Sequence, residues 1–213
     1  LFPSQHIHIG GDEANIDLWT NDPEMQTQME RLQLADAHEL HSWFIKQMDA
    51  FLARHGRRLV GWDEILQGGL APGATVMSWR GEQGGIAAAN AGHDVVMAPT
   101  SHTYLDYYQG PAESEPLAIG GDLPLARVYS YDPIPAPIEA DKVHHVLGVQ
   151  GQLWGEFIAT PEHLDYMAYP RAAALAEVGW SAKEAKDDAQ FLGRLRRHLE
   201  RLRTLGVHLR ALD

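Results

Sequence analysis

Residues 6–13 have the sequence HIHIGGDE, and this stretch decides the fold that we expect. Its two isoleucines alternate with histidines, a pattern that is typical of a short strand with one buried face. The two glycines that follow allow the backbone to turn sharply or to approach a ligand closely. Asp12 and Glu13 then place two carboxylates side by side at the carboxyl end of the predicted strand.

Two neighbouring carboxylates point to one of two roles. Like charges at such a short distance are costly unless a site uses them, for example as a proton donor beside an anion. Alternatively, Asp12 and Glu13 form the acidic first turn of a helix, where the helix dipole stabilises negative side chains. These eight residues alone leave both interpretations open.

The rest of the chain predicts strands that alternate with helices. Strands are expected near residues 6–10, 58–62, 74–79, 94–98 and 146–153, and helices near 24–55 (possible single break), 83–91, 161–178 and 187–205. The last helix is amphipathic with an arginine-rich outer face. This alternation predicts βα units and a parallel sheet. Residues 100–142 have no clean period and are rich in proline, which predicts a long functional loop or lid.

Acidic and aromatic residues follow the predicted strands at their carboxyl ends. These are Asp12-Glu13, Trp62-Asp63-Glu64, Trp79-Arg80, Tyr104 with Asp106, and Trp154 with Glu156. A (β/α)₈ barrel keeps its active site at this end of its strands. An open doubly wound sheet would instead use one switch point with a glycine-rich phosphate loop, and the sequence has no such fingerprint. We therefore expect an α/β fold of the TIM type.

Composition excludes several classes of partner and chemistry. The 213 residues include 17 basic and 29 acidic side chains, for a formal charge of −12. This balance argues against nucleic acid or an anionic membrane as a partner. The absence of cysteine excludes disulfides and thiolate chemistry. No apolar run is long enough to span a bilayer. The chain opens on Leu1-Phe2-Pro3 instead of methionine, so we expect a cut N-terminus from which any targeting signal was lost.

Five motifs, HIGGDE, GWDE, SWRG, YLDYYQ and QLWGEF, occur in this order along the chain. Together they resemble the family 20 glycoside hydrolases, the β-N-acetylhexosaminidases, from residue 6 to about residue 181. The resemblance implies a TIM-type (β/α)₈ barrel enzyme that removes terminal N-acetylglucosamine or N-acetylgalactosamine. The implied mechanism is substrate-assisted and retaining, an exception to the usual scheme of two carboxylates. This chemistry requires no metal or organic cofactor, and the sequence signals none.

The resemblance also implies a role for each matched residue. Glu13 matches the general acid that protonates the leaving oxygen and later activates water. Asp12 matches the residue that orients the 2-acetamido group and stabilises the charged intermediate. Tyr104 matches the hydroxyl that binds the acetamido carbonyl oxygen. The remaining matches are the aromatic walls of the pocket and the carboxylates that hold the sugar hydroxyls: Trp62, Trp79, Trp154, Asp106 and Glu156.

Physical chemistry supports these roles independently of the family. Glycosidic cleavage passes through an oxocarbenium-like state, so it needs an anion near the developing charge and an acid near the leaving oxygen. A nucleophile supplied by the substrate needs only alignment. Tryptophan suits a sugar because its ring stacks on C–H groups while its indole N–H remains a donor.

Some of these residues also have a structural interpretation. Each tryptophan taken singly is more often a core residue than a pocket wall. Asp63 could cap the following helix, and Glu64 could form a structural ion pair. His6 and His8 share a strand face but lack a third metal ligand, which favours a hydrogen-bonding role. Arg80 could pair with an acid in or under the pocket.

The chain supplies about five of the eight βα units of a barrel, which the resemblance assigns to strands 4 to 8. We expect residues 1–213 to be the C-terminal portion of a catalytic barrel, as a single domain. An arginine that would bind the sugar hydroxyls is expected from the missing strands and has no match here. An open sheet leaves two edges, so we expect an oligomeric partner or an N-terminal half to cover them. The resemblance favours a periplasmic or secreted location.

Two other functions remain open at this stage. A sugar-binding module would hold the amino sugar without releasing its leaving group. A different barrel glycosidase would use the general two-carboxylate mechanism, and an oxazoline-mimicking thiazoline would hardly inhibit it. The amino-sugar glycoside is the expected substrate in the preferred interpretation, and the sequence does not choose between the two sugars.

Overall fold

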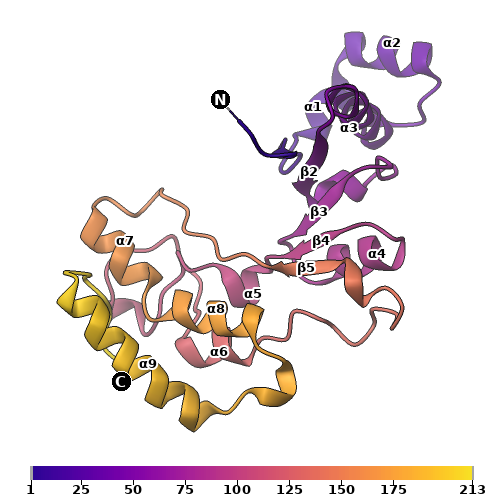
Figure 1. Ribbon diagram of the computed structural model, residues 1–213. Helices are drawn as coiled ribbons and strands as arrows, with labels where there is room; N and C mark the ends of the chain where they lie inside the picture. The colour runs from indigo at the N-terminus through magenta and orange to yellow at the C-terminus, as the bar shows by residue number, and fades with distance from the viewer. Residues whose placement is uncertain (1, 213) are drawn as a thin grey trace. The chain divides into compact units, whose positions relative to one another are not determined.

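The computed structural model describes residues 2–212 and contains one five-stranded sheet with helices between its strands (Figure 1). The strands are β1 (His6–His8), β2 (Arg58–Trp62), β3 (Thr75–Ser78), β4 (Val95–Met97) and β5 (Val146–Val149). They lie in chain order across the sheet, and β1 to β4 pair in parallel. Parallel strands in chain order, each followed by helix, are the arrangement of successive βα units in a TIM-type barrel. The predicted fold class is therefore confirmed.

Nine α-helices lie within residues 2–212. They are α1 (Ile16–Asn21), α2 (Pro23–Leu32), α3 (Ala37–Arg54), α4 (Gln83–Asn90), α5 (Thr100–Thr103), α6 (Leu125–Ser130), α7 (Pro161–Ala168), α8 (Arg171–Trp180) and α9 (Asp188–Thr204). The helix predicted near 24–55 is broken once, as allowed, where Gln33 takes a left-handed conformation. Pro170 separates α7 from α8, whereas one helix was expected there. None of the described helices has the length and apolar character needed to cross a membrane.

The prediction that residues 100–142 form one long loop is wrong. They contain two short α-helices, α5 and α6, and a 3₁₀ turn at Ala112–Ser114. The predicted strand near 146–153 is also shorter than expected, because β5 ends at Val149 and only an isolated bridge pairs Gln152 with Tyr104. Helices this short bury too few apolar positions to give a clear helical period in sequence.

The described chain divides into two compact units. The first contains residues 2–97 and 136–147, and the second contains residues 98–135 and 148–212. The core of the first unit lies under the sheet, where Leu59, Val76 and Val95 are fully buried. A Cβ atom at Gly85 would lie 2.5 Å from Sδ of Met97, so glycine is what lets α4 pack closely on β4.

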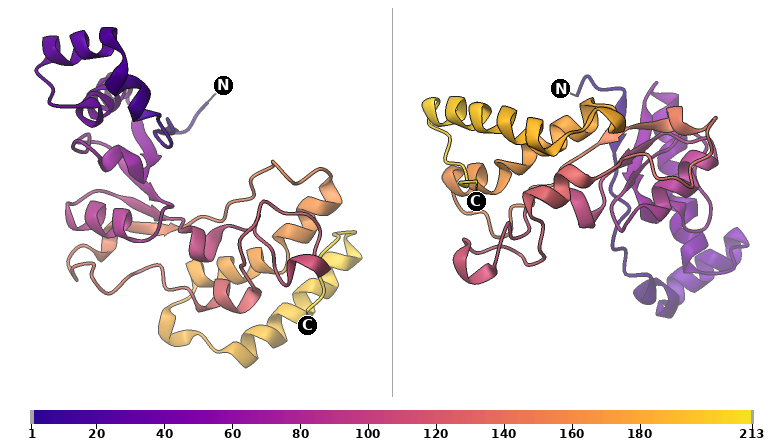
Figure 2. Two further views of the ribbon diagram at one scale, coloured as in Figure 1. Left: turned by 180° about the vertical axis from the view of Figure 1, so that it is seen from behind. Right: turned by 90° about the horizontal axis from the view of Figure 1, so that it is seen from below.

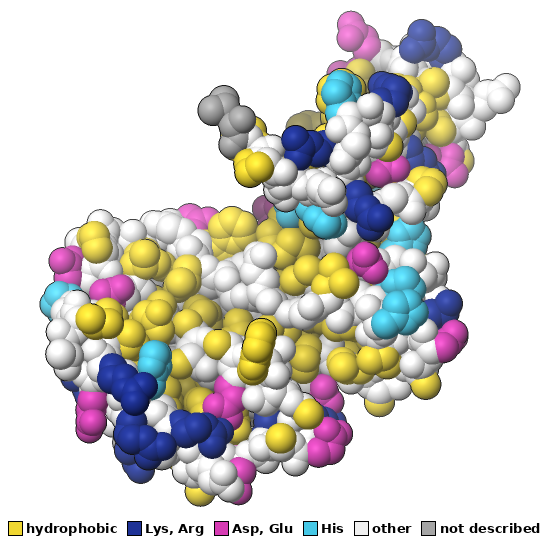
Figure 3. All heavy atoms as spheres, viewed as in Figure 1, with side chains coloured by type: hydrophobic (Ala, Val, Ile, Leu, Met, Phe, Trp, Pro, Cys, Tyr) yellow, Lys and Arg dark blue, Asp and Glu magenta, His cyan; other side chains and the backbone are white. Residues whose placement is uncertain are grey.

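In the second unit, α6 packs against α8 (Figure 2). The aromatic rings of Tyr129 and Phe191 stack with centroids 4.0 Å apart, which joins α6 to α9. Leu195 and Leu199 continue the buried face of α9. Lys and Arg side chains gather over the outer face of this helix (Figure 3). The amphipathic character predicted for α9 is therefore confirmed. Burial of its apolar face holds this helix against the rest of the second unit.

Candidate active site

The acidic pair lies on a turn that two glycines build beyond the end of β1. The φ angles are 75° at Gly10, 96° at Gly11 and 49° at Glu13. A positive φ costs glycine little but strains other residues, and within residues 2–212 only Glu13 and Gln33 are non-glycine residues with it. A Cβ atom at Gly11 would lie 2.7 Å from Cγ2 of Ile65. Space and backbone both therefore require glycine there, and the strained Glu13 is the kind of residue found at functional sites.

One hydrogen bond from the neighbouring strand β2 and one to His8 of β1 itself hold this turn in place. The backbone N–H of Trp62 donates to the carbonyl oxygen of Gly10 at 2.9 Å. The N–H of Gly10 donates to Nδ1 of His8 at 3.1 Å. Burial lowers the pKa of His8, while the charge of Asp12 opposes this shift, so a neutral ring accepts the bond. The hydrogen-bonding role predicted for His8 is confirmed.

Asp12 and Glu13 are both exposed, whereas Trp62 is buried at the end of β2 and contacts His8 edge-on, with ring centroids 5.1 Å apart. Glu13 lines a cavity of about 230 Å³ together with Glu64, Arg80 and side chains of α3. The acid predicted for proton transfer therefore faces a hollow in which two further charged side chains lie.

Two acids follow β2, in the 3₁₀ turn η1 (Asp63–Leu66), and both bind residues at the end of β3. The indole Nε1–H of Trp79 donates to Oε2 of Glu64 at 2.9 Å. Nε of Arg80 donates to Oδ1 of Asp63 at 2.7 Å and lies 3.4 Å from Oε1 of Glu64. The ion pairs predicted for Glu64 and Arg80 are confirmed. The carboxylate of Asp63 binds Arg80, and no side chain caps η1, so the capping interpretation is wrong.

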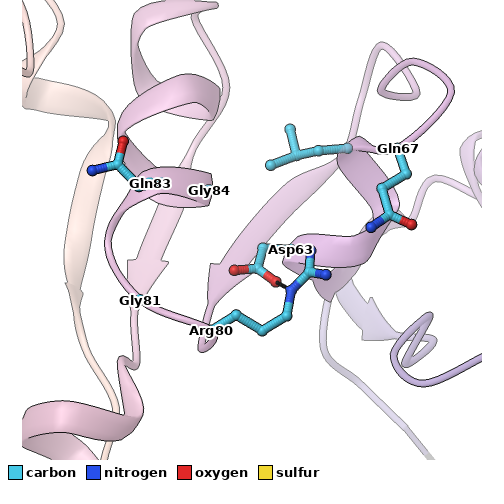
Figure 4. A pocket seen from close by; sticks show the side chains of 7 residues that line it. Asp63, Gln67, Arg80, Gly81, Gln83 and Gly84 are labelled. Carbon is cyan, nitrogen blue, oxygen red and sulfur yellow. Dashed lines mark hydrogen bonds and ion pairs between the residues drawn. The ribbon is translucent and has the colours of Figure 1, made fainter.

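Burial is the main influence on Glu64 and raises the pKa of its carboxyl group. The hydrogen bond from Trp79 and the charge of Arg80 both lower that pKa, while the charge of Asp63 raises it. In Figure 4, Arg80 reaches across to Asp63 at the edge of a cavity of about 400 Å³. A Cβ atom at Gly84 would lie 2.6 Å from Cβ of Asp63, so glycine is needed where α4 begins.

The second unit carries Tyr104 and Asp106 on the segment after α5, and both are buried. This segment is held by the chain around Gln152. The N–H of Leu105 donates to the carbonyl oxygen of Gln152 at 2.8 Å, and the N–H of Gln152 donates to that of Thr103 at 2.9 Å. The same chain continues to Trp154, which is 42% exposed, and to Glu156, which is also exposed.

Asp106 is the most perturbed acid of the second unit. Burial raises the pKa of its carboxyl group to about 6. Its own backbone N–H and the charge of Arg171 lower this pKa, and the charge of Glu156 raises it. Oδ1 of Asp106 is buried and has no hydrogen-bond partner within residues 2–212. A buried carboxylate oxygen with free acceptor capacity is suited to a hydroxyl donor.

The predicted site residues thus fall into two groups, one in each unit. The first unit carries Asp12, Glu13, Trp62 and Trp79, and the second carries Tyr104, Asp106, Trp154 and Glu156. Sequence reasoning left Glu64 and Arg171 out of the site. The GWDE motif was a signal for Glu64, and a charged residue beside the apolar run AAALA was a signal for Arg171. Within residues 2–212, no three His, Cys, Asp or Glu side chains are grouped as metal ligands would be.

Comparison with known proteins identifies the family. Residues 1–183 match the family model described as glycosyl hydrolase family 20, catalytic domain. The chain belongs to glycosyl hydrolase family 20. The resemblance of its five motifs to this family is therefore confirmed, and the members of the family are glycoside hydrolases.

Individual family 20 proteins resemble almost the whole chain. The β-hexosaminidase of Porphyromonas gingivalis is 53% identical over 209 residues, which cover 98% of this chain and 27% of that protein. The β-hexosaminidase of Vibrio furnissii is 39% identical over 86% of this chain and 30% of its own length. The crystal structure of the exo-β-N-acetylglucosaminidase of Vibrio harveyi, in complex with N-acetylglucosamine, superposes with a TM-score of 0.88 at 34% identity. The superposition covers 99% of this chain and 33% of the Vibrio harveyi chain. This chain thus spans about a third or less of the length of these relatives.

Proposed function

We propose that this chain is part of an exo-β-N-acetylhexosaminidase that removes terminal N-acetylglucosamine or N-acetylgalactosamine from glycosides. Membership of family 20 and the names of the relatives support this proposal. Residues 1–213 would form the C-terminal portion of the catalytic barrel as a single domain. An N-terminal half or an oligomeric partner would complete the barrel and cover the edges of the sheet.

The observation that carries the proposal is the turn after β1. It presents Asp12 and Glu13, both exposed, at the carboxyl end of a parallel strand, where barrel enzymes keep their catalytic groups. The positive φ at Glu13 is a strain that a simple helix-capping role does not require.

In the proposed mechanism, Glu13 first acts as a general acid. Its proton passes to the glycosidic oxygen while the carbonyl oxygen of the 2-acetamido group attacks the anomeric carbon, so the bond to the leaving group breaks. Asp12 holds the acetamido N–H and stabilises the positive charge of the oxazolinium-like intermediate. The hydroxyl of Tyr104 donates to the acetamido oxygen and helps to align it for attack.

In the second step, Glu13 acts as a general base. The ionised carboxylate takes a proton from water, the water oxygen attacks the anomeric carbon, and the bond to the acetamido oxygen breaks. Two displacements on the same carbon retain its configuration. One residue can perform both steps because the first leaves it in the protonation state that the second requires.

The remaining predicted residues would bind the sugar. Asp106 and Glu156 would accept hydrogen bonds from its hydroxyls, and the open acceptor capacity of Oδ1 of Asp106 supports this role. Trp62, Trp79 and Trp154 would form the apolar walls. The complexes of the Vibrio harveyi and Streptomyces plicatus family members with N-acetylglucosamine favour this sugar as the first one to test.

The test is release of nitrophenol from nitrophenyl β-N-acetylglucosaminide. We would assay three forms: the chain alone, the chain extended toward its N-terminus, and an exchange enzyme. In the exchange enzyme this chain replaces the 209-residue match in the Porphyromonas gingivalis β-hexosaminidase. We expect release by the extended form and the exchange enzyme, with inhibition by a thiazoline that mimics the oxazoline. Activity that the thiazoline leaves unchanged would indicate the two-carboxylate mechanism. Folded but inactive forms that bind N-acetylglucosamine would indicate a sugar-binding module.

A further inference from the structure

Arg171, in the first turn of α8, is a charged side chain with no exposed surface. Its guanidinium donates four hydrogen bonds, all to backbone carbonyl oxygens, at distances between 2.6 and 2.9 Å. The acceptors are the carbonyls of Leu105, Tyr107, Leu123 and Met167. No role was assigned to this residue by the sequence motifs.

Two of these carbonyls lie on either side of a predicted substrate-binding residue. Nη2 donates to the carbonyl oxygen of Leu105 at 2.6 Å, and Nη1 donates to that of Tyr107 at 2.9 Å. The peptide group before Asp106 and the carbonyl of the following residue are therefore both tied to one rigid guanidinium. Turning Asp106 away would leave a buried donor or acceptor without its partner, which is costly.

The other two bonds anchor the same guanidinium to the rest of the second unit. Nη1 also donates to Leu123, two residues after Gly121, and Nη2 also donates to Met167 in α7. A lysine ammonium could not reproduce this pattern, because it has three donors on a single atom, whereas arginine presents five in a planar fork. The guanidinium thus joins three segments of the second unit: residues 105–107, the chain at Leu123, and α7 at Met167.

Arg171 also places positive charge next to the buried acid. Burial lowers the pKa of Arg171 to about 9, and the charge of Asp106 is the main opposing influence, followed by that of Glu115. Glu115 is itself bound by Arg210 at 2.7 Å and by the hydroxyl of Tyr166 at 2.8 Å. The charged and titratable groups that act on Asp106 are thus Glu156, which disfavours its ionised form, and Arg171, which favours it. The nearby phenol of Tyr107 is neutral, because burial and Asp106 raise its pKa.

We propose that Arg171 is a positioning residue for sugar binding, because it fixes the backbone on both sides of Asp106 and places a positive charge near its carboxyl group. The proposal rests on the proposed function through the assignment of Asp106 to the sugar hydroxyls. Arg171 itself does not touch the sugar.

Two substitutions of Arg171 distinguish the contribution of its planar set of hydrogen-bond donors, the fork, from the contribution of its positive charge. Arg171→Lys keeps the charge and loses the fork, whereas Arg171→Met loses both. In the exchange enzyme we expect Arg171→Lys to reduce kcat/KM on the aryl glycoside by about tenfold, because the four carbonyls lose their shared donor. Arg171→Met should reduce it further. Arg196→Lys, on the exposed face of α9, is the matched control and should leave kcat/KM unchanged.

Carbon NMR of the Asp106 carboxyl group in the 213-residue chain reads the coupling directly, with Asp106→Asn to assign the signal. We expect Arg171→Met to raise the titration midpoint of Asp106, because the positive charge that favours the ionised form is lost, and Arg171→Lys to leave it near that of the parent. An unchanged midpoint in folded Arg171→Met would overturn the electrostatic part of the proposal. If Arg171→Met does not fold, Arg171→Lys decides, since unchanged kcat/KM in this variant would overturn the positioning role.

Failure of the proposed function would look different. An exchange enzyme without glycosidase activity would count against the proposed reaction, yet the Asp106 midpoint would still report its coupling to Arg171. Binding of N-acetylglucosamine, measured by calorimetry, would then replace kcat/KM. Binding that is equal in the parent and in Arg171→Lys would count against the positioning role.

Discussion

The indole nitrogen of Trp79 and Oε2 of Glu64 lie 2.9 Å apart and share a hydrogen bond that joins the ends of β3 and β2. Glu64 is buried, and Arg80 lies 3.4 Å from its other oxygen. A buried carboxylate with two donors of this kind fixes the plane of the indole ring. The orientation of one predicted pocket wall therefore depends on an acid that does not need to touch the sugar.

Glu64→Leu should lower the free energy of unfolding by about 1–3 kcal/mol, because the indole N–H and Arg80 lose a buried acceptor. Glu64→Gln keeps an amide oxygen for the indole and should lower it less. Urea unfolding followed by tryptophan fluorescence measures both variants. Glu200→Gln, on exposed α9, is the control. Equal stability of Glu64→Leu and the parent would show that the hydrogen bond contributes nothing.

Glu13→Gln should reduce hydrolysis of substrates with poor leaving groups by roughly 10²–10⁴-fold, the usual contribution of a general acid. Activated aryl glycosides should be spared more, because their leaving groups need little protonation. Steady-state kinetics of the exchange enzyme on an alkyl and a nitrophenyl glycoside give the comparison. An equal loss on both substrates would remove Glu13 from the role of acid.

Asp12→Asn should lower kcat by about 10²-fold without abolishing sugar binding, because the amide cannot stabilise the positive intermediate as an anion does. The measurement is kcat together with calorimetric binding of N-acetylglucosamine. Asp17→Asn, an exposed substitution in α1, serves as the control. Unchanged turnover would exclude Asp12 from the mechanism.

Gly11→Ala should lower the free energy of unfolding by more than about 2 kcal/mol and also reduce activity, since it combines a positive φ with overpacking against Ile65. Gly56→Ala is the matched control: its φ is 67°, and nothing lies within 4 Å of the added Cβ. It should cost only about 1 kcal/mol. Similar costs at both positions, from denaturant unfolding, would mean that the turn after β1 tolerates the extra atom.

Asp106 should make stability depend on pH. The pKa of its carboxyl group is about 6 in the folded chain against a model value of 3.8, so the folded state binds more protons between these values. Stability is therefore lost as the pH rises through this window, by at most about 3 kcal/mol. Asp106→Asn has no carboxyl group to titrate at this position, so it does not lose this stability as the pH rises. The free energy of unfolding of Asp106→Asn, relative to that of the parent, should therefore rise from pH 4 to pH 7. Urea unfolding at both values tests this, and a constant difference would contradict it.

The sequence alone determined the order of the strands, the acids and aromatics at their ends, and the family. These features are local, because a strand period, a glycine pair or a five-residue motif depends on residues next to one another in the chain. The turn after β1 belongs to this class: Gly10 and Gly11 signal a positive φ wherever they occur. The sequence did not predict the short helices within residues 100–142, because they are too short to show a helical period.

Only the tertiary structure decided what surrounds each predicted side chain. Three of the carbonyls that Arg171 binds are 48 to 66 residues away along the chain, and Trp79 lies 15 residues from Glu64. Whether a charged residue is buried, and which donor or acceptor it meets, depends on how distant segments pack together. No pattern of neighbouring residues encodes that packing. The sequence therefore predicted Asp106 as a site residue, whereas only the tertiary structure showed that Arg171 binds the backbone on both sides of it.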